Sequence, residues 1–163
     1  MRVAVVAGSA SDVEYVKRAK KTFESLDIGT DVFVLSAHRT PDEAVDFAKS
    51  AEKKGYSAII AIAGMAAHLA GVLSANTVLP VIAVPVATGA FGGLDALLSS
   101  VQMPKGVPVG VVTVGETGAE NAALLIARFL AVNDLQLKKR LLEHKERLRK
   151  DALASQRDLE NSL

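Results

Sequence analysis

The sequence predicts an α/β domain of the doubly wound type, a sandwich of three layers in which helices cover both faces of a parallel sheet. Its 163 residues are the length of one ordinary domain. Short apolar runs alternate with amphipathic segments of helical period, which favours parallel strands joined by right-handed crossovers. The expected organisation is a single domain over residues 1–163, in which residues 134–163 form a long C-terminal helical arm.

Five apolar runs are the expected strands. They are rich in Val, Ile and Ala and are nearly continuous, whereas a half-exposed strand would alternate apolar with polar residues. Continuous runs are typical of parallel strands that are buried on both faces. In chain order the runs are residues 3–7, 32–35, 58–63, 81–84 and 109–114.

The first two helices are expected over residues 12–26 and 41–54. Apolar residues recur at a spacing of three to four in the first of them. The second begins at Thr40-Pro41-Asp42-Glu43, a capping box with Pro at the first helical position and Glu at the third. Gly55 lies just past its expected end.

Two more helices, built of small residues, are expected over residues 66–76 and 119–131. The arm differs from the rest of the chain because it contains eight basic and six acidic residues. Pairs such as Asp134–Lys138 and Glu146–Lys150 have the favourable i,i+4 order. Its leucines repeat at seven residues, which is compatible both with a helix docked on its own domain and with an arm that packs on a neighbouring subunit.

Charge is nearly absent from the middle of the chain. Residues 55–115 include only two charged side chains, Asp95 and Lys105. Glycines and prolines divide this stretch into pieces shorter than the roughly 18–20 apolar residues of a membrane-spanning helix. A chain this small cannot bury so much uncharged surface alone, which predicts a homo-oligomer.

Composition also narrows the classes of function. The net charge of +1 gives no reason to expect nucleic acid or a membrane as partner. The absence of Cys excludes disulfides, thiolate nucleophiles and Cys-ligated metals. The N-terminal apolar run is too short for a signal peptide, so we expect a cytoplasmic protein.

Ligands of a doubly wound sheet bind beyond the carboxyl ends of its strands, so the residues that follow each strand are the candidates. After the first strand come Gly8, Ser9, Ser11 and Asp12, at the start of a helix. Backbone N–H groups and the helix dipole there suit a phosphate. The alternative is that Ser11 or Asp12 only caps the helix.

The loop after the second strand includes Ser36, His38 and Arg39. Arg39 could bind a phosphate through two N–H groups, or it could be a surface residue paired with Asp42. The N-terminus of the following helix would keep His38 neutral and able to accept a proton near pH 7, although a structural histidine is the alternative.

His68 follows the third strand in an uncharged run, and burial is expected to favour its neutral form. It could be a second acid/base or a hydrogen-bonding positioner. No His or carboxylate spacing supports a metal site, and no nucleophile elbow or nucleotide-binding glycine motif is present. What is left is acid/base chemistry on a phosphorylated small molecule, without a cofactor.

The motifs at these positions resemble those of the N5-carboxyaminoimidazole ribonucleotide mutases, also called the catalytic subunit of phosphoribosylaminoimidazole carboxylase. The matching stretches follow the family's order over nearly the whole chain: Gly8-Ser9-Ala10-Ser11-Asp12, Ser36-Ala37-His38-Arg39-Thr40-Pro41-Asp42, Ala66-Ala67-His68-Leu69, Leu97-Leu98-Ser99, Val101-Gln102-Met103-Pro104, Gly106-Val107-Pro108-Val109 and Asn121-Ala122-Ala123-Leu124-Leu125.

The resemblance implies a flavodoxin-like fold, a homo-octamer and a cofactor-independent isomerase of purine (IMP) biosynthesis. Its reaction moves a carboxyl group from N5 to C4 of aminoimidazole ribonucleotide (AIR), converting N5-CAIR to CAIR by decarboxylation and recarboxylation within the site. Carried over by motif, His38 is the acid/base. The implied substrate-binding residues are Gly8, Ser9, Ser11, Asp12, Ser36, Arg39, Gly64, Ala66, Ala67 and His68. Ser9, Ser11, Ser36 and Arg39 would hold the 5′-phosphate, Asp12 the ribose hydroxyls, and His68 would lie near the carboxylate.

Arg39 and His68 favour the mutases over a sister class that carboxylates AIR directly with carbon dioxide. That class remains the alternative, as does a nucleotide-binding module without catalysis. The chain also departs from the family pattern. Met65 adds bulk where the mutases have glycine, Ala70 replaces a proline, and the loop of residues 88–93 has Phe91 in place of Leu and no basic residue.

Overall fold

The computed structural model describes residues 1–160, without the side chains of residues 157 and 158. The chain forms two compact units, the first of which is Met1–Ile126, while the second begins at Ala127. The last three residues of the predicted arm, 161–163, lie outside the described residues. No helix among the described residues is long and apolar enough to cross a membrane.

The first unit is built on a five-stranded sheet in the order β2-β1-β3-β4-β5, with every pair of neighbours parallel. The register aligns Val5 of β1 with Val32 of β2 and with Ile60 of β3, and Ile60 with Ile82 of β4. The strands are β1 (Arg2–Ala7), β2 (Gly29–Val34), β3 (Ala58–Ala63), β4 (Val81–Pro85) and β5 (Gly110–Val111).

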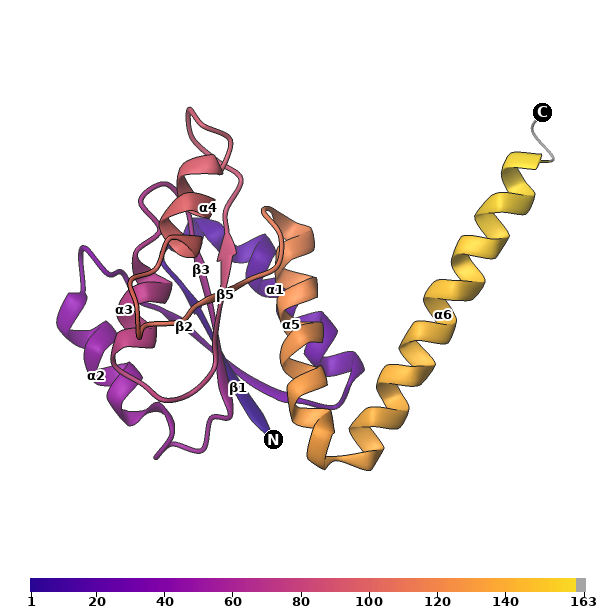
Figure 1. The fold of residues 1–163 in the computed structure, drawn as a ribbon, viewed down its shortest axis with the longest axis horizontal. Helices are drawn as coiled ribbons and strands as arrows, with labels where there is room; N and C mark the ends of the chain where they lie inside the picture. The colour runs from indigo at the N-terminus through magenta and orange to yellow at the C-terminus, as the bar shows by residue number, and fades with distance from the viewer. Residues whose placement is uncertain (161–163) are drawn as a thin grey trace. The chain divides into compact units, whose positions relative to one another are not determined.

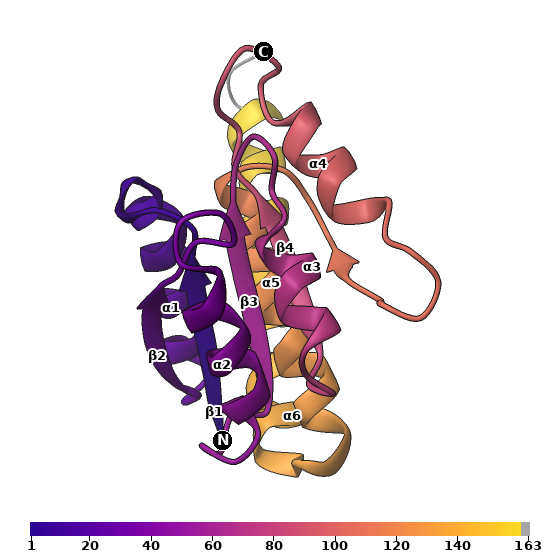
Figure 2. The same ribbon diagram turned by 90° about the vertical axis from the view of Figure 1, so that its left-hand side faces the viewer.

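Helices lie on both faces of this sheet (Figure 1), which confirms the predicted α/β fold of the flavodoxin-like type. Helices α2 and α3 cover one face, seen towards the viewer in Figure 2, and α1 and α5 cover the other. The helices are α1 (Val13–Ser25), α2 (Pro41–Ala51), α3 (Leu69–Ala75), α4 (Leu94–Val101), α5 (Glu116–Leu130) and α6 (Leu135–Glu160), with short 3₁₀ turns at Ala10–Asp12 and Ala131–Asn133.

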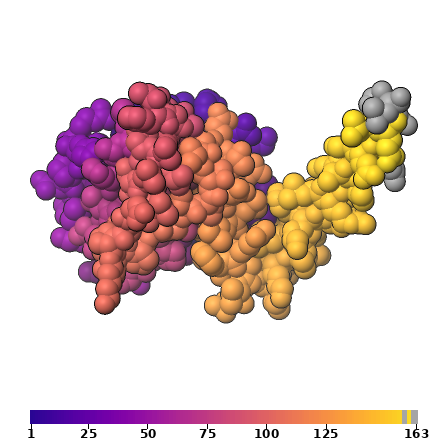
Figure 3. Space-filling model, turned by 45° about the horizontal axis from the view of Figure 1, so that its top comes forward, coloured from indigo at the N-terminus to yellow at the C-terminus, as the bar shows by residue number. Residues whose placement is uncertain are grey.

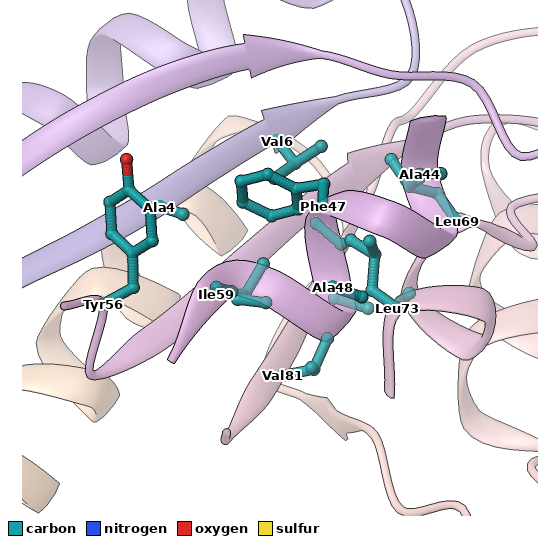
Figure 4. Packing of buried hydrophobic residues seen from close by; sticks show 14 residues of the cluster. Ala4, Val6, Ala44, Phe47, Ala48, Tyr56, Ile59, Leu69, Leu73 and Val81 are labelled. Carbon is teal, nitrogen blue, oxygen red and sulfur yellow. The ribbon is translucent and has the colours of Figure 1, made fainter. Parts of the chain in front are cut away.

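The core between the sheet and α2/α3 consists of small and branched apolar side chains together with two aromatic rings, those of Phe47 and Tyr56 (Figure 4). Ala44, Phe47, Ala48 and Ala51 are the buried face of α2, as their spacing predicts. Removing apolar surface from water stabilises this layer by about 25 cal/mol per Å². The core therefore positions the ends of β1, β3 and β4 rigidly.

Two expected strands prove to be edge strands that are only partly buried. Val32 and Val34 of β2 are 44% and 56% exposed, so the prediction of burial on both faces is wrong for β2. The run 109–114 pairs over only two residues, Gly110 and Val111. Continuous apolar character indicates a strand but does not indicate how many neighbours the strand has.

Helix α4 was not among the predicted helices. Gly93 precedes it with φ of +90°, and a Cβ at Gly93 would lie only 2.9 Å from the Cα of Ala87. Leu94, Leu98 and Val101 share one face of α4 and remain 49–55% exposed. Figure 3 shows the segment that contains α4, coloured pink to salmon, at the surface.

In the second unit, α6 is one continuous helix, as predicted. Its N-cap is Asp134, whose Oδ1 accepts a hydrogen bond of 2.8 Å from the Leu137 backbone N–H. Among the described residues Glu146 pairs with Arg149 and not with Lys150, so the predicted i,i+4 pairs of Asp134 and Glu146 are wrong. Leu135, Leu142 and Leu148 are more than half exposed.

Candidate active site

The carboxyl ends of β1, β2 and β3 meet at one edge of the sheet because these strands are neighbours in the order β2-β1-β3. The loops that follow them surround a cavity of about 530 Å³. This is the position where doubly wound sheets bind ligands. Every predicted site residue except Ala67 lines the cavity: Gly8, Ser9, Ser11, Asp12, Ser36, His38, Arg39, Gly64, Ala66 and His68.

The loop after β1 presents two hydroxyls side by side. Ser9 is the N-cap of the short 3₁₀ turn, and its Oγ accepts from the Ser11 backbone N–H at 3.2 Å. The Ser11 hydroxyl donates to the same oxygen at 2.8 Å. The expected capping by Ser11 or Asp12 is wrong, since Ser9 makes the cap and Asp12 makes no side-chain cap at α1.

Asp12 is half-buried beside these hydroxyls. Burial raises the pKa of its carboxyl above the ordinary value, while hydrogen bonds with the Ser11 side chain and the Ser9 backbone lower it in part. A carboxylate that is partly dehydrated accepts hydrogen bonds from ligand hydroxyls more strongly than a fully solvated one. Asp12 is therefore suited to a sugar.

Thr40 bonds back to the loop after β2 and does not form the expected capping box. Its Oγ1 accepts from the Ser36 backbone N–H at 2.8 Å and donates to the Ser36 carbonyl at 3.2 Å. The predicted side-chain cap is therefore wrong, although α2 begins at Pro41 as expected. The Ser36 Oγ accepts from the Arg39 backbone N–H at 3.2 Å. These bonds fix the turn that carries His38 and Arg39.

Arg39 links the first two loops. Its Nη2 donates to the Gly8 carbonyl at 3.1 Å. Among the described residues Arg39 forms no ion pair with Asp42 or any other carboxylate, so the alternative of a paired surface residue is wrong. The guanidinium has five N–H donors, and the other donors remain available to an anion in the cavity.

His38 and His68 come from different loops and contact each other. The Nε2 of His38 lies 2.8 Å from the Nδ1 of His68, and the ring planes are inclined at 73°. Such a bond needs one N–H and one lone pair, so at least one of the two facing nitrogens is unprotonated. The expected burial of His68 is wrong because its ring is exposed on the cavity wall.

The loop after β3 forms the remaining wall. Gly64 is packed so closely that a Cβ there would lie 3.0 Å from the Thr88 Cγ2, which brings the loop after β4 against it. Ala66 lines the cavity, whereas Ala67 is 2% exposed and points into the core. Ala67 is not among the residues that line the cavity, and its expected contact with the substrate stays a prediction.

Several lining residues were not assigned to the site: Ala37, Ala63, Met65, Leu69, Thr88 and Gly89. Thr88 and Gly89 follow β4, so the rule that found the first three loops would also have found them. Tyr15 of α1 anchors this loop, since its hydroxyl accepts from the Ala87 backbone N–H at 3.1 Å.

His144 lies outside this site. Its position in the charged arm predicts a solvated side chain, but its Nε2 is buried and has no hydrogen-bond partner among the described residues. Across residues 1–160 no group of three or more His, Asp and Glu side chains could hold a metal ion.

Comparisons of the chain with family models, curated proteins and solved structures all find the same family. The family model described as AIR carboxylase matches residues 2–151. The chain is 52% identical over 140 residues to the N5-carboxyaminoimidazole ribonucleotide mutase of Escherichia coli strain K12, covering 86% of this chain and 83% of that protein. It is 45% identical over 153 residues to the mutase of Bacillus subtilis strain 168, covering 94% of each. The crystal structure of Treponema denticola PurE superposes with a TM-score of 0.87 at 26% identity, covering 97% of this chain and 98% of that one.

Proposed function

The chain belongs to the AIR carboxylase family, and we propose that it is the mutase that converts N5-CAIR to CAIR in purine biosynthesis. The observation that carries this conclusion is the pair of histidines, in contact at 2.8 Å, on the wall of a cavity that also holds Arg39. The Escherichia coli relative named N5-carboxyaminoimidazole ribonucleotide mutase is 52% identical to the chain, which favours this isomerase over a carboxylase that uses carbon dioxide as substrate.

The reaction needs one proton delivered to N5 and one proton removed from C4. When the N5–carboxyl bond breaks, its electron pair stays on N5, which takes a proton, and carbon dioxide is released. C4 then supplies the electron pair for the new bond to carbon dioxide and loses its own proton. One acid/base is enough, because the proton given to N5 equals the proton removed from C4.

We assign this role to His38. The contact with His68 supports the assignment because it orients the His38 ring and gives its Nε2 a partner for a proton. His68 would act as a positioning residue on the side of the substrate carboxylate. No step requires a redox group or a metal, so we propose that the enzyme works without a cofactor.

The polar loops suit the rest of the ribonucleotide. We place the 5′-phosphate between Ser9, Ser11, Ser36 and Arg39, beside the backbone of Gly8. The guanidinium and hydroxyls would make charge-assisted hydrogen bonds to phosphate oxygens. Asp12 would accept hydrogen bonds from the ribose hydroxyls. Gly64 and Ala66 are small enough for the flat ring to approach the wall closely.

We further propose that the enzyme is a cytoplasmic homo-octamer. The exposed apolar face of α4 supports an oligomer, because Leu94, Leu98, Val101 and the preceding Phe91 are 49–70% exposed. Apolar surfaces of this kind mark protein–protein contacts. In this assembly residues 1–163 form one α/β domain, and residues 134–163 are an arm whose exposed leucines pack on another subunit.

Incubation of the purified protein with each substrate tests the function. We expect CAIR to form from N5-CAIR in buffer without added bicarbonate. Turnover of AIR plus bicarbonate, but not of N5-CAIR, would assign the protein to the carboxylase class instead. Turnover of neither substrate would indicate a binding module.

A further inference from the structure

Met65 has a backbone conformation that L-residues rarely adopt. Its φ is +52°, in the left-handed region where glycine is favoured. Among the described non-glycine residues only Asp27 shares this property, and Asp is one of the residues that tolerate it. A methionine that has no such local compensation requires another reason.

The reason is not burial in the core. The Met65 side chain is 62% exposed and lines the cavity. Two contacts fix the loop that carries Met65. Gly64 is packed against Thr88 and Val86, and the His68 backbone N–H donates to the Ala66 carbonyl at 2.8 Å. The turn therefore directs an apolar side chain towards the cavity within three residues of His68.

The Met65 side chain lies beside the loop after β4. Gly89, in the loop after β4, also has a positive φ, of +74°. A Cβ at Gly89 would lie 3.6 Å from the Met65 Cγ, an ordinary van der Waals distance, so the Met65 side chain packs beside the backbone of Gly89. Met65 and Gly89 thus belong to two adjoining loops that both line the cavity.

We propose that Met65 is a positioning residue that retains the released carbon dioxide beside C4 until the new bond forms. This inference rests on the proposed mutase function. Carbon dioxide has no net charge or dipole and its oxygens are weak hydrogen-bond acceptors, so arginine and hydroxyl donors hold it poorly. A flexible, polarizable thioether packs against such a molecule and excludes water from it. Without that cover, carbon dioxide escapes and AIR is left behind.

The experiment measures how much of the carboxyl group stays in the site. N5-CAIR labelled with ¹³C in its carboxyl group is converted in buffer that contains unlabelled bicarbonate. The ratio of labelled to unlabelled CAIR and the amount of free AIR are measured by mass spectrometry. An enzyme-free sample corrects for spontaneous loss of the carbamate.

We expect the wild-type protein to retain nearly all of the label. Met65→Gly and Met65→Ala should release several-fold more AIR per CAIR formed, and Met65→Leu should restore retention. Glycine relieves the backbone strain of the positive φ, whereas alanine does not. If both variants retain less label than the wild type, the effect therefore comes from the loss of the methionine side chain and not from a change in backbone strain. Val78→Ala, which trims an 84% exposed apolar residue outside this cavity, should retain the label like the wild type.

A protein that is merely destabilised has less active enzyme but an unchanged ratio of labelled to unlabelled product. Equal retention in the wild type, Met65→Gly and Met65→Ala would overturn the proposal, as would complete label exchange in the wild type. If the wild type made no CAIR from N5-CAIR, the proposed function itself would fail.

Discussion

The two ends of the same strands carry polar clusters of opposite character. At the amino end, Arg2 of β1 pairs with Asp31 of β2, and the Tyr56 hydroxyl donates to the same carboxylate at 2.8 Å. The Arg2 guanidinium also lies 5.1 Å from the centre of the Tyr56 ring. At the carboxyl end, Arg39 has no carboxylate partner among the described residues, and the two histidines bond only to each other on an open cavity wall.

The cluster at the amino end is structural and the one at the carboxyl end is functional, because their hydrogen-bonding groups differ in whether they have partners within the protein. The charges at the amino end neutralise each other, so they hold strands together and leave nothing for a ligand. At the carboxyl end several donors have no partner within the protein. Water can satisfy these donors before a ligand binds, and an anion that binds there forms charge-assisted hydrogen bonds with them, which contributes to its binding free energy. Variants at the two ends should therefore affect different quantities.

His38→Asn should have the largest effect, because it removes the proposed acid/base. We expect turnover to fall by about 10²–10⁴-fold. Binding of CAIR and the melting temperature should remain close to wild type, since asparagine can still make a hydrogen bond at that position. Steady-state kinetics, calorimetry of CAIR binding and thermal unfolding check the three quantities. Near-normal turnover would remove His38 from the mechanism.

Arg39→Ala should mainly weaken binding of the phosphorylated ligand. Loss of a charge-assisted hydrogen bond costs about 1.5–3 kcal/mol, or roughly 10–150-fold in Kd. Titration calorimetry with CAIR measures it. Arg18→Ala is the matched control, because Arg18 is paired with Glu116 at 3.1 Å and does not line the cavity. If both variants bound CAIR like the wild type, the phosphate assignment would be wrong.

Tyr56→Phe should have the smallest effect and should act on stability alone. The pKa of the Asp31 carboxyl lies below its ordinary value of 3.8, first because of the Tyr56 hydroxyl and then because of Arg2. A lowered pKa means that this carboxylate stabilises the fold above about pH 4, and that the contribution is lost as the pH falls through the folded-state pKa.

Removing the hydroxyl should therefore lower the melting temperature at neutral pH by about 1–4 °C. The difference from wild type should shrink below pH 4. Thermal unfolding followed by circular dichroism at several pH values measures it, with turnover at pH 7 as the control. A large loss of turnover would show that the two ends are not independent.

The sequence predicts the sheet, the loops at its carboxyl edge and the placement of His38 and His68 after two of its strands, because the spacing of apolar residues and the position of the loops follow from local patterns. It does not predict which strands are edges, since the run of residues 32–35, which overlaps β2, is as apolar as a central strand. It also misplaces the hydrogen bonds of the Thr40 hydroxyl, because a hydroxyl can satisfy either of two backbone groups. The short α4 was missed because a short apolar segment that follows two glycines has no clear period.

The outer edge of β2 has a consequence for handling the protein at high concentration. Among the described residues this strand pairs only with β1, and it carries two exposed valines. Unpaired strand edges are templates for aggregation, and charged residues on them oppose it. Asp31 is the only charged residue of β2, so the cluster that joins two strands within one chain also keeps separate chains from pairing edge to edge.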